Sequence, residues 1–460
     1  MRQSYARSLS PSQGGWRTQR HGRGDLHCDL PRCGSGTASV NRRQIVGGAA
    51  AATATAMLSP RGVAAASPRI VIVGGGFAGA SCARALREID NRVAITLVEA
   101  RRTYTALPLS NGVLGGIRQL ADQQFSYEQI AAAGIKVAFA SATAVDPQAR
   151  RVTLSTGERL PYDRLVLAPG IDFHWDALPG YDQAAAAQLP HAWTADGEQI
   201  HLLRRQIEAM DDDGVVAIVV PVNPTRCPPG PYERASMIAY YLKSKKPRSK
   251  IVILDDKESF SMQQLFQNAW KELYPGLIEW VSPSSGGNVA SVDVANKTIA
   301  TDFDTYKFAV ANVIPRQKAA QITVAAGVAD RTGWCPIDPL SFESLLQKNI
   351  HVIGDAALAG AMPKSAFAGS VQGKLCAAAI VRLLAGEVAV APKLVSNCYS
   401  IVAPDYAISI AGVYQPVEGQ YLEVKGAGGV SPLTAPPAFR AEEAKYADAW
   451  FRTNTSEIFG

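Results

Sequence analysis

Short runs of apolar residues alternate along the chain with segments whose apolar residues have helical spacing. This pattern predicts strands that alternate with helices. Apolar runs at 70–73 and 93–98 are short and rich in β-branched residues, as in buried strands, and the segment 80–89 between them has the pattern of a helix. The same order returns later, with predicted strands at 214–221 and 250–254 around a helix at 231–244. Repeated strand–helix–strand units predict an α/β fold built on parallel sheets.

A glycine-rich turn joins the first strand to the first helix. Gly74, Gly76 and Gly79 have the GxGxxG spacing, which allows a tight turn, close approach of a pyrophosphate and close packing of the helix. The start of the helix then offers free N–H groups to phosphates. Glu99 ends the second strand, where a carboxylate can accept hydrogen bonds from a ribose. An ordinary glycine-rich turn is the alternative, but strand, helix, strand and acid together predict a dinucleotide site.

The second strand–helix–strand unit lacks this turn. Asp255 and Asp256 follow its second strand, as in a nucleotide-binding domain. Where phosphate-binding glycines belong, however, the chain has prolines at 224, 228, 229 and 231. Proline has no backbone N–H to donate and cannot form the tight glycine turn. We therefore predict a degenerate NAD-like domain that does not bind NAD(P)H.

Later segments change the prediction from a dinucleotide to FAD. Segments at 135–140, 151–154 and 159–162 alternate like antiparallel strands, and predicted strands at 162–170, 308–314 and 350–353 precede a helix at 371–384. Gly354 and Asp355 follow a buried strand, where an acid suits the ribityl chain of a flavin. The predicted FAD-binding residues are Gly74, Gly76, Phe77, Ala78, Gly79, Glu99, Ala100, Arg101, Ala144, Val145, Ala168, Pro169, Gly170, Gly354, Asp355 and Lys364.

These elements predict two Rossmann-like domains and a smaller third one. The FAD domain is discontinuous, at 67–180 and 322–390, and the NAD-like domain at 181–321 is inserted into it. Residues 391–460 form a C-terminal α+β domain, which we expect to contact a partner or a second copy. Its last helix carries Phe439, Tyr446 and Trp450 near helical spacing, which suits core packing or a partner surface.

Charge is concentrated in the first 66 residues. The chain has 460 residues and a net charge of +6, but residues 1–66 hold nine arginines and two aspartates, so the remainder is close to neutral. Without a clustered basic face in that remainder, nucleic-acid binding is not predicted. Arg42 and Arg43 precede an apolar run at 45–57 and an A-x-A site before Ser67, which predicts a twin-arginine signal and a periplasmic protein. A low-complexity linker is the alternative. We predict no membrane-spanning segment in the mature chain.

Five cysteines remain once the leader is removed. Cys227 precedes a predicted helix, whose N-terminus should lower the pKa of its thiol, as should Arg226 if that side chain points inward. A structural thiol or disulfide is the alternative. Its redox partner is Cys335 or Cys398, and spacing does not choose between them. Cys82 and Cys376 lie within predicted helices, as core thiols do.

Few other residues suggest catalysis. Glu233 lies in the first turn of the Cys227 helix, where it could act as a general base or only compensate the helix dipole. The histidines are isolated, and no spacing suggests a metal site.

Several motifs resemble one flavoprotein family. They are VIVGGGFAGA (71–80), LSNGVLGG (109–116), YDRLVLAPGI (162–171), LPHAW (189–193), RCPPGPYERAS (226–236), GWCPID (333–338), HVIGDA (351–356), MPKSAFA (362–368) and NCYSIVAP (397–404). With these motifs, the chain resembles the flavin-binding subunits of flavocytochrome c sulfide dehydrogenases, in the glutathione-reductase-like group that includes sulfide:quinone reductases.

The resemblance implies a redox-active disulfide beside the flavin, between Cys227 and Cys398, and sulfide as the substrate. It also implies a c-type cytochrome partner, whose haem must lie on another polypeptide because this chain has no C-x-x-C-H motif. Members of the family can attach FAD through a cysteine before the LSN motif. Leu107 occupies that region here, so we predict non-covalent FAD. Rival functions are a sulfide:quinone reductase, an NAD(P)H-dependent disulfide reductase and a non-catalytic flavoprotein of a sulfur-oxidation system.

Overall fold

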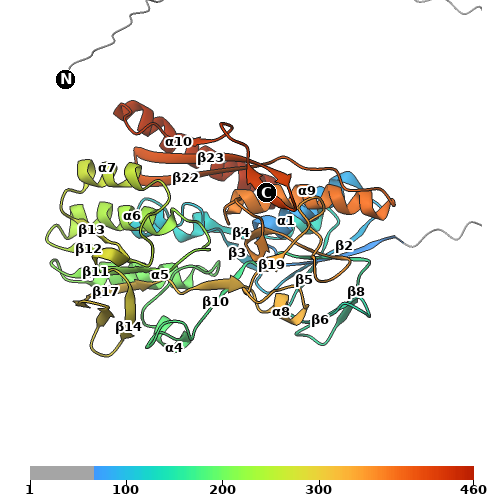
Figure 1. The fold of residues 1–460 in the computed structure, drawn as a ribbon, viewed down its shortest axis with the longest axis horizontal. Coiled ribbons are helices and arrows are strands. Elements are labelled where there is room, and N and C mark those ends of the chain that lie inside the picture. The colour runs from blue at the N-terminus through green and yellow to red at the C-terminus, as the bar shows by residue number, and fades with distance from the viewer. Residues whose placement is uncertain (1–66) are drawn as a thin grey trace, which may run out of the picture. The chain divides into compact units, whose positions relative to one another are not determined.

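The computed structural model describes residues 67–460, which form two main parallel sheets with helices and smaller sheets around them (Figure 1). The predicted leader at 1–66 lies outside the described residues. Strands from two distant parts of the chain share the first sheet, so the predicted discontinuous FAD domain and the α/β class are confirmed.

The first sheet has the order β20-β9-β1-β2-β5, and all its pairs are parallel. Its strands are β1 (Arg69–Val73), β2 (Ala94–Glu99), β5 (Lys136–Phe139), β9 (Arg164–Leu167) and β20 (Ile350–Val352). Ile70 and Ile72 of β1 are fully buried, and burying such a side chain is worth about 1.5–3 kcal/mol. The segment 135–140 was predicted as antiparallel, but β5 pairs with β2 in parallel. The alternation of apolar and polar residues indicates which face of a strand is buried, but it does not indicate the direction of the neighbouring strand.

Two helices from the two FAD-domain segments pack closely on each other. They are α1 (Phe77–Ile89) and α9 (Ala366–Leu384), each of which begins before its predicted start. A Cβ on Gly373 would lie 2.3 Å from the Ala78 carbonyl oxygen, so only glycine permits this approach. Of the helices between 67 and 460, only α9 is long and apolar enough to cross a membrane, and its packing against α1 already accounts for its apolar face.

The second sheet lies within 181–321 and has the order β13-β12-β11-β17. Its main elements are α5 (Glu198–Ala209), β11 (Val215–Val220), α6 (Gly230–Lys245), β12 (Lys250–Asp255), α7 (Gln263–Leu273), β13 (Ile278–Val281) and β17 (Val310–Val313). Asp255 is fully buried and accepts hydrogen bonds from Tyr232 (2.5 Å), Trp280 (2.9 Å) and Lys257 (2.6 Å). This enclosure leaves Asp255 no surface to offer a ribose.

The chain enters and leaves this domain through two adjacent strands. These are β10 (Ile171–Phe173) and β18 (Gln317–Ala319), which pair antiparallel. The remaining elements before the C-terminal domain are β3 (Thr103–Thr105), α2 (Asn111–Gly115), β4 (Gln124–Ser126), α3 (Glu128–Ala132), β6 (Ala142–Asp146), β7 (Arg151–Leu154), β8 (Arg159–Pro161), α4 (Gln183–Ala186), β14 (Val289–Asp293), β15 (Thr298–Thr301), β16 (Thr305–Lys307), α8 (Ile322–Ala325), β19 (Cys335–Pro336) and β21 (Ala357–Leu358).

The C-terminal segment forms an antiparallel sheet covered by a long helix. Its elements are β22 (Leu394–Ala403), β23 (Tyr406–Val417), β24 (Gln420–Glu423), β25 (Gly429–Val430) and α10 (Pro437–Phe459). Phe459, near the C-terminus, stacks on Tyr104 and Phe125 of the FAD domain. Phe439 and Tyr446 are exposed, while Trp450 is half-buried. The prediction that these aromatic residues pack in the core is therefore wrong for Phe439 and Tyr446.

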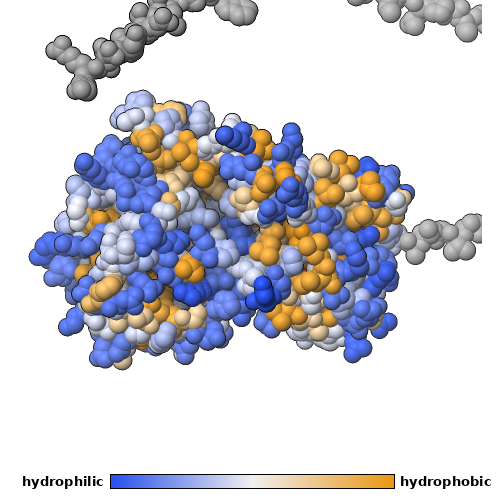
Figure 2. Space-filling view, viewed as in Figure 1, coloured by the Kyte–Doolittle hydropathy of each residue, from blue (hydrophilic) through white to orange (hydrophobic). Residues whose placement is uncertain are grey.

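Apolar side chains also reach the surface of the FAD domain. Leu340, Leu345, Leu346 and Leu358 are all at least 36% exposed. Figure 2 shows apolar surface over the region where Figure 1 labels β19 and α8. Exposed apolar surface of this kind is typical of a contact face for another protein.

Candidate functional site

A cavity of about 1410 Å³, partly open to solvent, lies where the three parts of the chain meet. Small-molecule sites are concave and combine apolar walls with a few polar groups, and this cavity has both, with Phe77 and Leu107 beside Glu99 and Asp355. The predicted cofactor residues that line it are Gly74, Gly76, Phe77, Ala78, Glu99, Arg101, Ala168, Pro169, Gly170, Gly354 and Asp355. Residues 67–180 and 354–355 thus converge on one cavity, as an FAD domain requires.

Five predicted cofactor residues do not line the cavity: Gly79, Ala100, Ala144, Val145 and Lys364. Ala144 and Val145 lie on β6, where the first is exposed and the second is in the core. Ala100 is exposed. Lys364 turns its Nζ to the carbonyl oxygens of Asp355 (2.7 Å) and Ala357 (2.8 Å). Burial lowers the pKa of Lys364 to about 8, and its contacts support the backbone beside the cavity.

The first turn has the tight glycine geometry that the spacing predicts. Gly74 has a left-handed φ of +101°, and a Cβ there would lie 2.3 Å from the Ala168 oxygen. A Cβ on Gly79 would lie 1.9 Å from the Gly74 oxygen, so glycine is required for the helix to start this close to the strand. Gly76 faces the cavity, where a Cβ would meet the Tyr104 ring only at 3.4 Å. The turn therefore leaves backbone exposed to a phosphate at Gly76.

Glu99 is held in place by backbone donors. Its carboxylate accepts hydrogen bonds from the N–H groups of Gly75 (2.8 Å) and Arg101 (3.0 Å). These contacts leave lone pairs on both oxygens and orient the group at the cavity wall. The arrangement fits the predicted contact with a ribose.

Cys227 is positioned by a tight loop before α6. Its φ is +51°, in the left-handed region that non-glycine residues seldom adopt, and its N–H donates to the Lys364 oxygen (2.8 Å). A Cβ on Gly230 would lie 3.1 Å from the Cys227 sulfur. Glycine at this position leaves room for the sulfur, a role that the sequence had not indicated.

Cys398, on β22, lines the same cavity as Cys227. Cys335 is fully buried and lines no part of this cavity, and burial raises the pKa of its thiol to about 12. Spacing had left both cysteines open as partners of Cys227. The fold brings Cys398 to it and keeps Cys335 in the core. Both site cysteines are free thiols in this structure.

The pKa of the Cys227 thiol is not lowered, so this prediction is wrong. Burial raises it well above its ordinary value, and the nearby Cys398, Glu233 and Asp355 act in the same direction. The N–H of Gly230, at the start of the helix, opposes this rise only in part. Arg226 does not compensate either, because its guanidinium is turned to a carboxylate.

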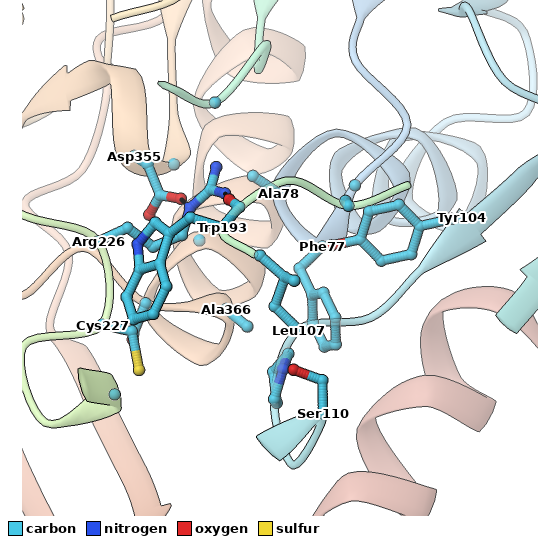
Figure 3. Close-up of a pocket in the computed structure, with 18 of the residues that line it drawn as sticks. Phe77, Ala78, Tyr104, Leu107, Ser110, Trp193, Arg226, Cys227, Asp355 and Ala366 are labelled. Carbon is cyan, nitrogen blue, oxygen red and sulfur yellow. Dashed lines mark hydrogen bonds and ion pairs between the residues drawn. The ribbon is translucent and has the colours of Figure 1, made fainter. Parts of the chain in front are cut away.

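Arg226 joins the cysteine loop to the FAD domain. Its Nε donates to Oδ2 of Asp355 at 2.6 Å, and its Nη1 donates to the Trp193 oxygen at 3.1 Å. Figure 3 shows Arg226 and Asp355 turned toward each other beside Trp193, with Leu107 and Phe77 across the cavity. Leu107 lines the cavity, and the lining cysteines of the described chain are Cys227 and Cys398, so the Leu107 loop offers no thiol to a flavin.

Glu233 is a buried carboxyl group held by other elements. It accepts hydrogen bonds from Asn111 (3.0 Å) and from the N–H of Ile401 (3.1 Å). Burial raises its pKa to about 7, despite these bonds and the nearby Arg234. A carboxyl group that titrates near neutral pH suits proton transfer better than dipole compensation.

Asn111, Arg234 and Trp193 support this part of the site, and the sequence had assigned them no role. Arg234 donates to Asn111 (3.1 Å) and stacks over the Trp193 ring at 4.6 Å. All three lie in motifs that carried the family resemblance, which was the only available signal. No group of three or more potential metal ligands occurs between residues 67 and 460.

Three family models match the chain. A pyridine nucleotide-disulphide oxidoreductase model matches residues 68–207. A model for the central part of the sulfide dehydrogenase [flavocytochrome c] flavoprotein chain matches residues 200–315. A model for the flavin-binding part of flavocytochrome c sulphide dehydrogenase matches residues 390–459.

Individual relatives agree with these models. A flavoprotein chain of sulfide dehydrogenase [flavocytochrome c] from Chlorobaculum thiosulfatiphilum is 49% identical over 45 residues, which are 94% of that sequence and 10% of this chain. The mitochondrial sulfide:quinone oxidoreductase of Dictyostelium discoideum is 23% identical, and the match covers 63% of this chain and 65% of that protein, just under two thirds of its length. The sulfide:quinone oxidoreductase structure from Aquifex aeolicus has the same fold, with a TM-score of 0.62, 15% identity and coverage of 85% and 92% of the two chains.

Proposed function

Because the chain belongs to the family of flavocytochrome c sulfide dehydrogenase flavoprotein chains, we propose that it oxidises sulfide and passes the electrons to a c-type cytochrome subunit. FAD is its cofactor. One observation carries the proposal: Cys227 and Cys398, far apart in the sequence, line the cavity that the FAD-domain glycines and Asp355 also line.

The proposed chemistry is thiol–disulfide exchange followed by electron transfer. In the oxidised protein Cys227 and Cys398 form a disulfide, which hydrosulfide attacks. One cysteine then carries a persulfide and the other is released as a thiolate. FAD, when bound, supplies the conversion of a two-electron step into one-electron steps. Glu233 accepts the proton that sulfide loses, because its carboxyl group titrates near neutral pH beside the cysteine pair.

The chain itself points to an acceptor other than NAD. The turn of the second domain has prolines in place of phosphate-binding glycines, and Asp255 is enclosed. The 460 residues contain no C-x-x-C-H motif, which supports a cytochrome acceptor that is a separate polypeptide. We place both proteins in the periplasm, on the basis of the twin-arginine pattern at 41–66.

One anaerobic titration tests the proposal. Sulfide and NADH are added to separate samples of the oxidised flavoprotein while the visible absorbance of the flavin is followed, and oxidised c-type cytochrome is then added to the sample with sulfide. Sulfide should bleach the flavin, NADH should not, and the cytochrome should restore the oxidised spectrum. Bleaching by NADH alone would contradict the proposal.

Cysteine variants make the test specific. Cys227→Ser and Cys398→Ser should each slow sulfide-driven bleaching by at least about 10³-fold while FAD stays bound. Cys335→Ala is the matched control, because Cys335 is buried away from the cavity and this variant should bleach normally. Full activity in Cys227→Ser would end the proposal.

A quinone is the second candidate acceptor, because the chain is similar to two sulfide:quinone oxidoreductases. The same titration separates the two acceptors if a short-chain quinone replaces the cytochrome. Reoxidation by the quinone and not by the cytochrome would favour this second function. A flavin that sulfide does not bleach at all would indicate a non-catalytic flavoprotein.

A further inference from the structure

Two cysteines outside the cofactor cavity lie on the two helices that join the separate segments of the FAD domain. Cys82 is on α1 and Cys376 is on α9, and both side chains are fully buried free thiols. Neither residue lines the cofactor cavity, and the proposed oxidation of sulfide uses neither of them. A single buried cysteine packs as a small apolar side chain, but two cysteines that face each other can form a bond.

The packing of α1 on α9 determines which residues of the two helices face each other. The hydroxyl oxygens of Ser81 and Ser370 lie 2.9 Å apart. A Cβ built on Gly373 would lie 2.3 Å from the Ala78 carbonyl oxygen and 3.0 Å from the backbone nitrogen of Cys82. The backbones of the two helices therefore meet beside Cys82.

Cys376 lies on the same face of α9, three residues after Gly373. Residues three or four positions apart are neighbours on the surface of a helix, so the face that carries Gly373 toward α1 also carries Cys376. Burial and the neighbouring Cys82 thiol both raise the pKa of Cys376 well above its ordinary value. The helix register and this interaction place the two thiols side by side.

Glycine at position 373 also favours the short separation that a disulfide needs. The two Cα atoms of a disulfide are usually about 4.4–6.8 Å apart, whereas the axes of packed helices are usually about 8–10 Å apart. Because Gly373 has no side chain, α9 approaches α1 more closely than larger residues would allow. The close approach occurs next to the cysteine pair.

We propose that Cys82 and Cys376 form a disulfide that links the two segments of the FAD domain. Disulfides persist in oxidising compartments such as the periplasm, where we place this protein. The oxidant is a second disulfide compound, which reacts while the helices are transiently apart. The thiolate of one cysteine attacks this compound and forms a mixed disulfide, and the thiolate of the other cysteine then displaces the remaining half. The Cys82–Cys376 bond forms, and the oxidant leaves as two thiols that take up the two protons of the cysteines.

The bond would act on the cofactor because both helices begin at its cavity. Ala78 of α1 and Ala366 and Gly369 of α9 line that cavity. The loop closed by the bond contains the whole NAD-like domain at 181–321, and closing a long loop restricts the unfolded chain. The disulfide therefore stabilises the folded FAD domain and opposes any separation of the two helices that would let FAD leave.

Peptide mapping is the first test. The purified holoprotein is incubated with oxidised glutathione, its remaining thiols are alkylated in denaturant, and the chain is digested without reduction. Mass spectrometry should find a pair of peptides in which Cys82 is linked to Cys376, while Cys335 carries the alkyl group. An alkyl group or glutathione on both Cys82 and Cys376 would overturn the proposal.

Thermal unfolding and FAD release test the effect of the bond. For each variant the oxidised form is compared with the reduced form, so that the cost of the substitution itself cancels. In Cys82→Ala and in Cys376→Ala, the difference in Tm between the two forms should be smaller by roughly 3–5 °C than in the unaltered protein. Oxidation should slow FAD release less in these variants than in the unaltered protein.

Cys335→Ala is the matched control. Cys335 is also fully buried in the FAD domain, but it lies on β19 and not on these helices, so its loss should leave the difference in Tm unchanged. The Cys227–Cys398 pair contributes equally to all these proteins. An unchanged difference in Cys82→Ala would overturn the proposal. The proposed function fails separately, if sulfide does not bleach the flavin of the unaltered protein.

Discussion

The Nε of Arg226 lies 2.6 Å from Oδ2 of Asp355, and this ion pair ties the cysteine loop of the second domain to the FAD domain. Both side chains are largely buried, with exposed fractions of 17% and 15%. Arg226 directly precedes Cys227, and Asp355 lines the cofactor cavity. The pair therefore sets the position of the redox sulfur relative to the cofactor.

Removing one partner of this ion pair should lower the stability of the folded protein. Arg226→Ala leaves the Asp355 carboxylate without its main partner, so we expect the free energy of unfolding to fall by about 3 kcal/mol. Chemical denaturation of the holoprotein measures this. Arg316→Ala is the control, since its pair with Asp256 is more exposed (52% and 23%) and should contribute less than about 1 kcal/mol. Equal losses in the two variants would contradict a special role for the Arg226 pair.

The close approach of α1 to β1 depends on Gly79. In Gly79→Ala the new methyl group would lie 1.9 Å from the Gly74 oxygen, so the turn must deform. We expect a loss of about 3 kcal/mol in stability and a purified protein with little bound FAD. Flavin absorbance per protein and thermal unfolding measure both effects. Gly429→Ala, where a Cβ meets no atom within 4 Å, should retain its FAD. A normal FAD content in Gly79→Ala would show that the turn does not hold the cofactor.

Glu233 should make stability depend on pH. Its pKa rises from 4.5 to about 7 on folding, so the folded protein binds a proton that the unfolded chain releases between these values. The free energy of unfolding should therefore fall as the pH rises from about 4.5 to 7, by up to roughly 3 kcal/mol. Denaturation at several pH values measures the slope.

Glu233→Gln should remove this slope, because glutamine does not titrate. Glu442→Gln is the control: Glu442 is half-exposed and pairs with an exposed lysine, so the slope should persist. A slope that is the same in Glu233→Gln and in the unaltered protein would assign the titration to another group.

Denaturation of the protein should release FAD in chemically unmodified form. Leu107 stands in the loop where related proteins can carry a cysteine, and it lines the cavity without offering a thiol. Acid or heat treatment should release all the flavin into the supernatant, where its absorbance and mass identify it as FAD. Flavin that stays with the precipitated chain, in the unaltered protein or in Cys227→Ser, would show a covalent bond that the Leu107 loop cannot make.

Local pattern was sufficient for the elements and for the anchor of the cofactor. The GxGxxG turn, its flanking strands and Glu99 lie within a short stretch, and their roles follow from backbone geometry that adjacent residues determine. The absence of a phosphate-binding glycine turn from the second domain could be predicted for the same reason. Ala144 and Val145 were misplaced relative to the cavity: their strand, β6, pairs with β7 in a separate antiparallel sheet, and the pattern of a short strand does not specify which sheet it joins.

The sequence alone predicted a dinucleotide site at the βαβ turn of residues 74–79. A glycine turn, a helix start and an acid at the end of a strand are all local features. Only the tertiary structure decided how the reactive groups combine. It brought Cys398 to Cys227, turned Arg226 away from the thiol toward Asp355, and enclosed Glu233 until its pKa approached 7. These outcomes depend on burial and on contacts between residues far apart in the chain. A periodic pattern of apolar residues specifies which side chains are buried, but not which distant groups are buried together.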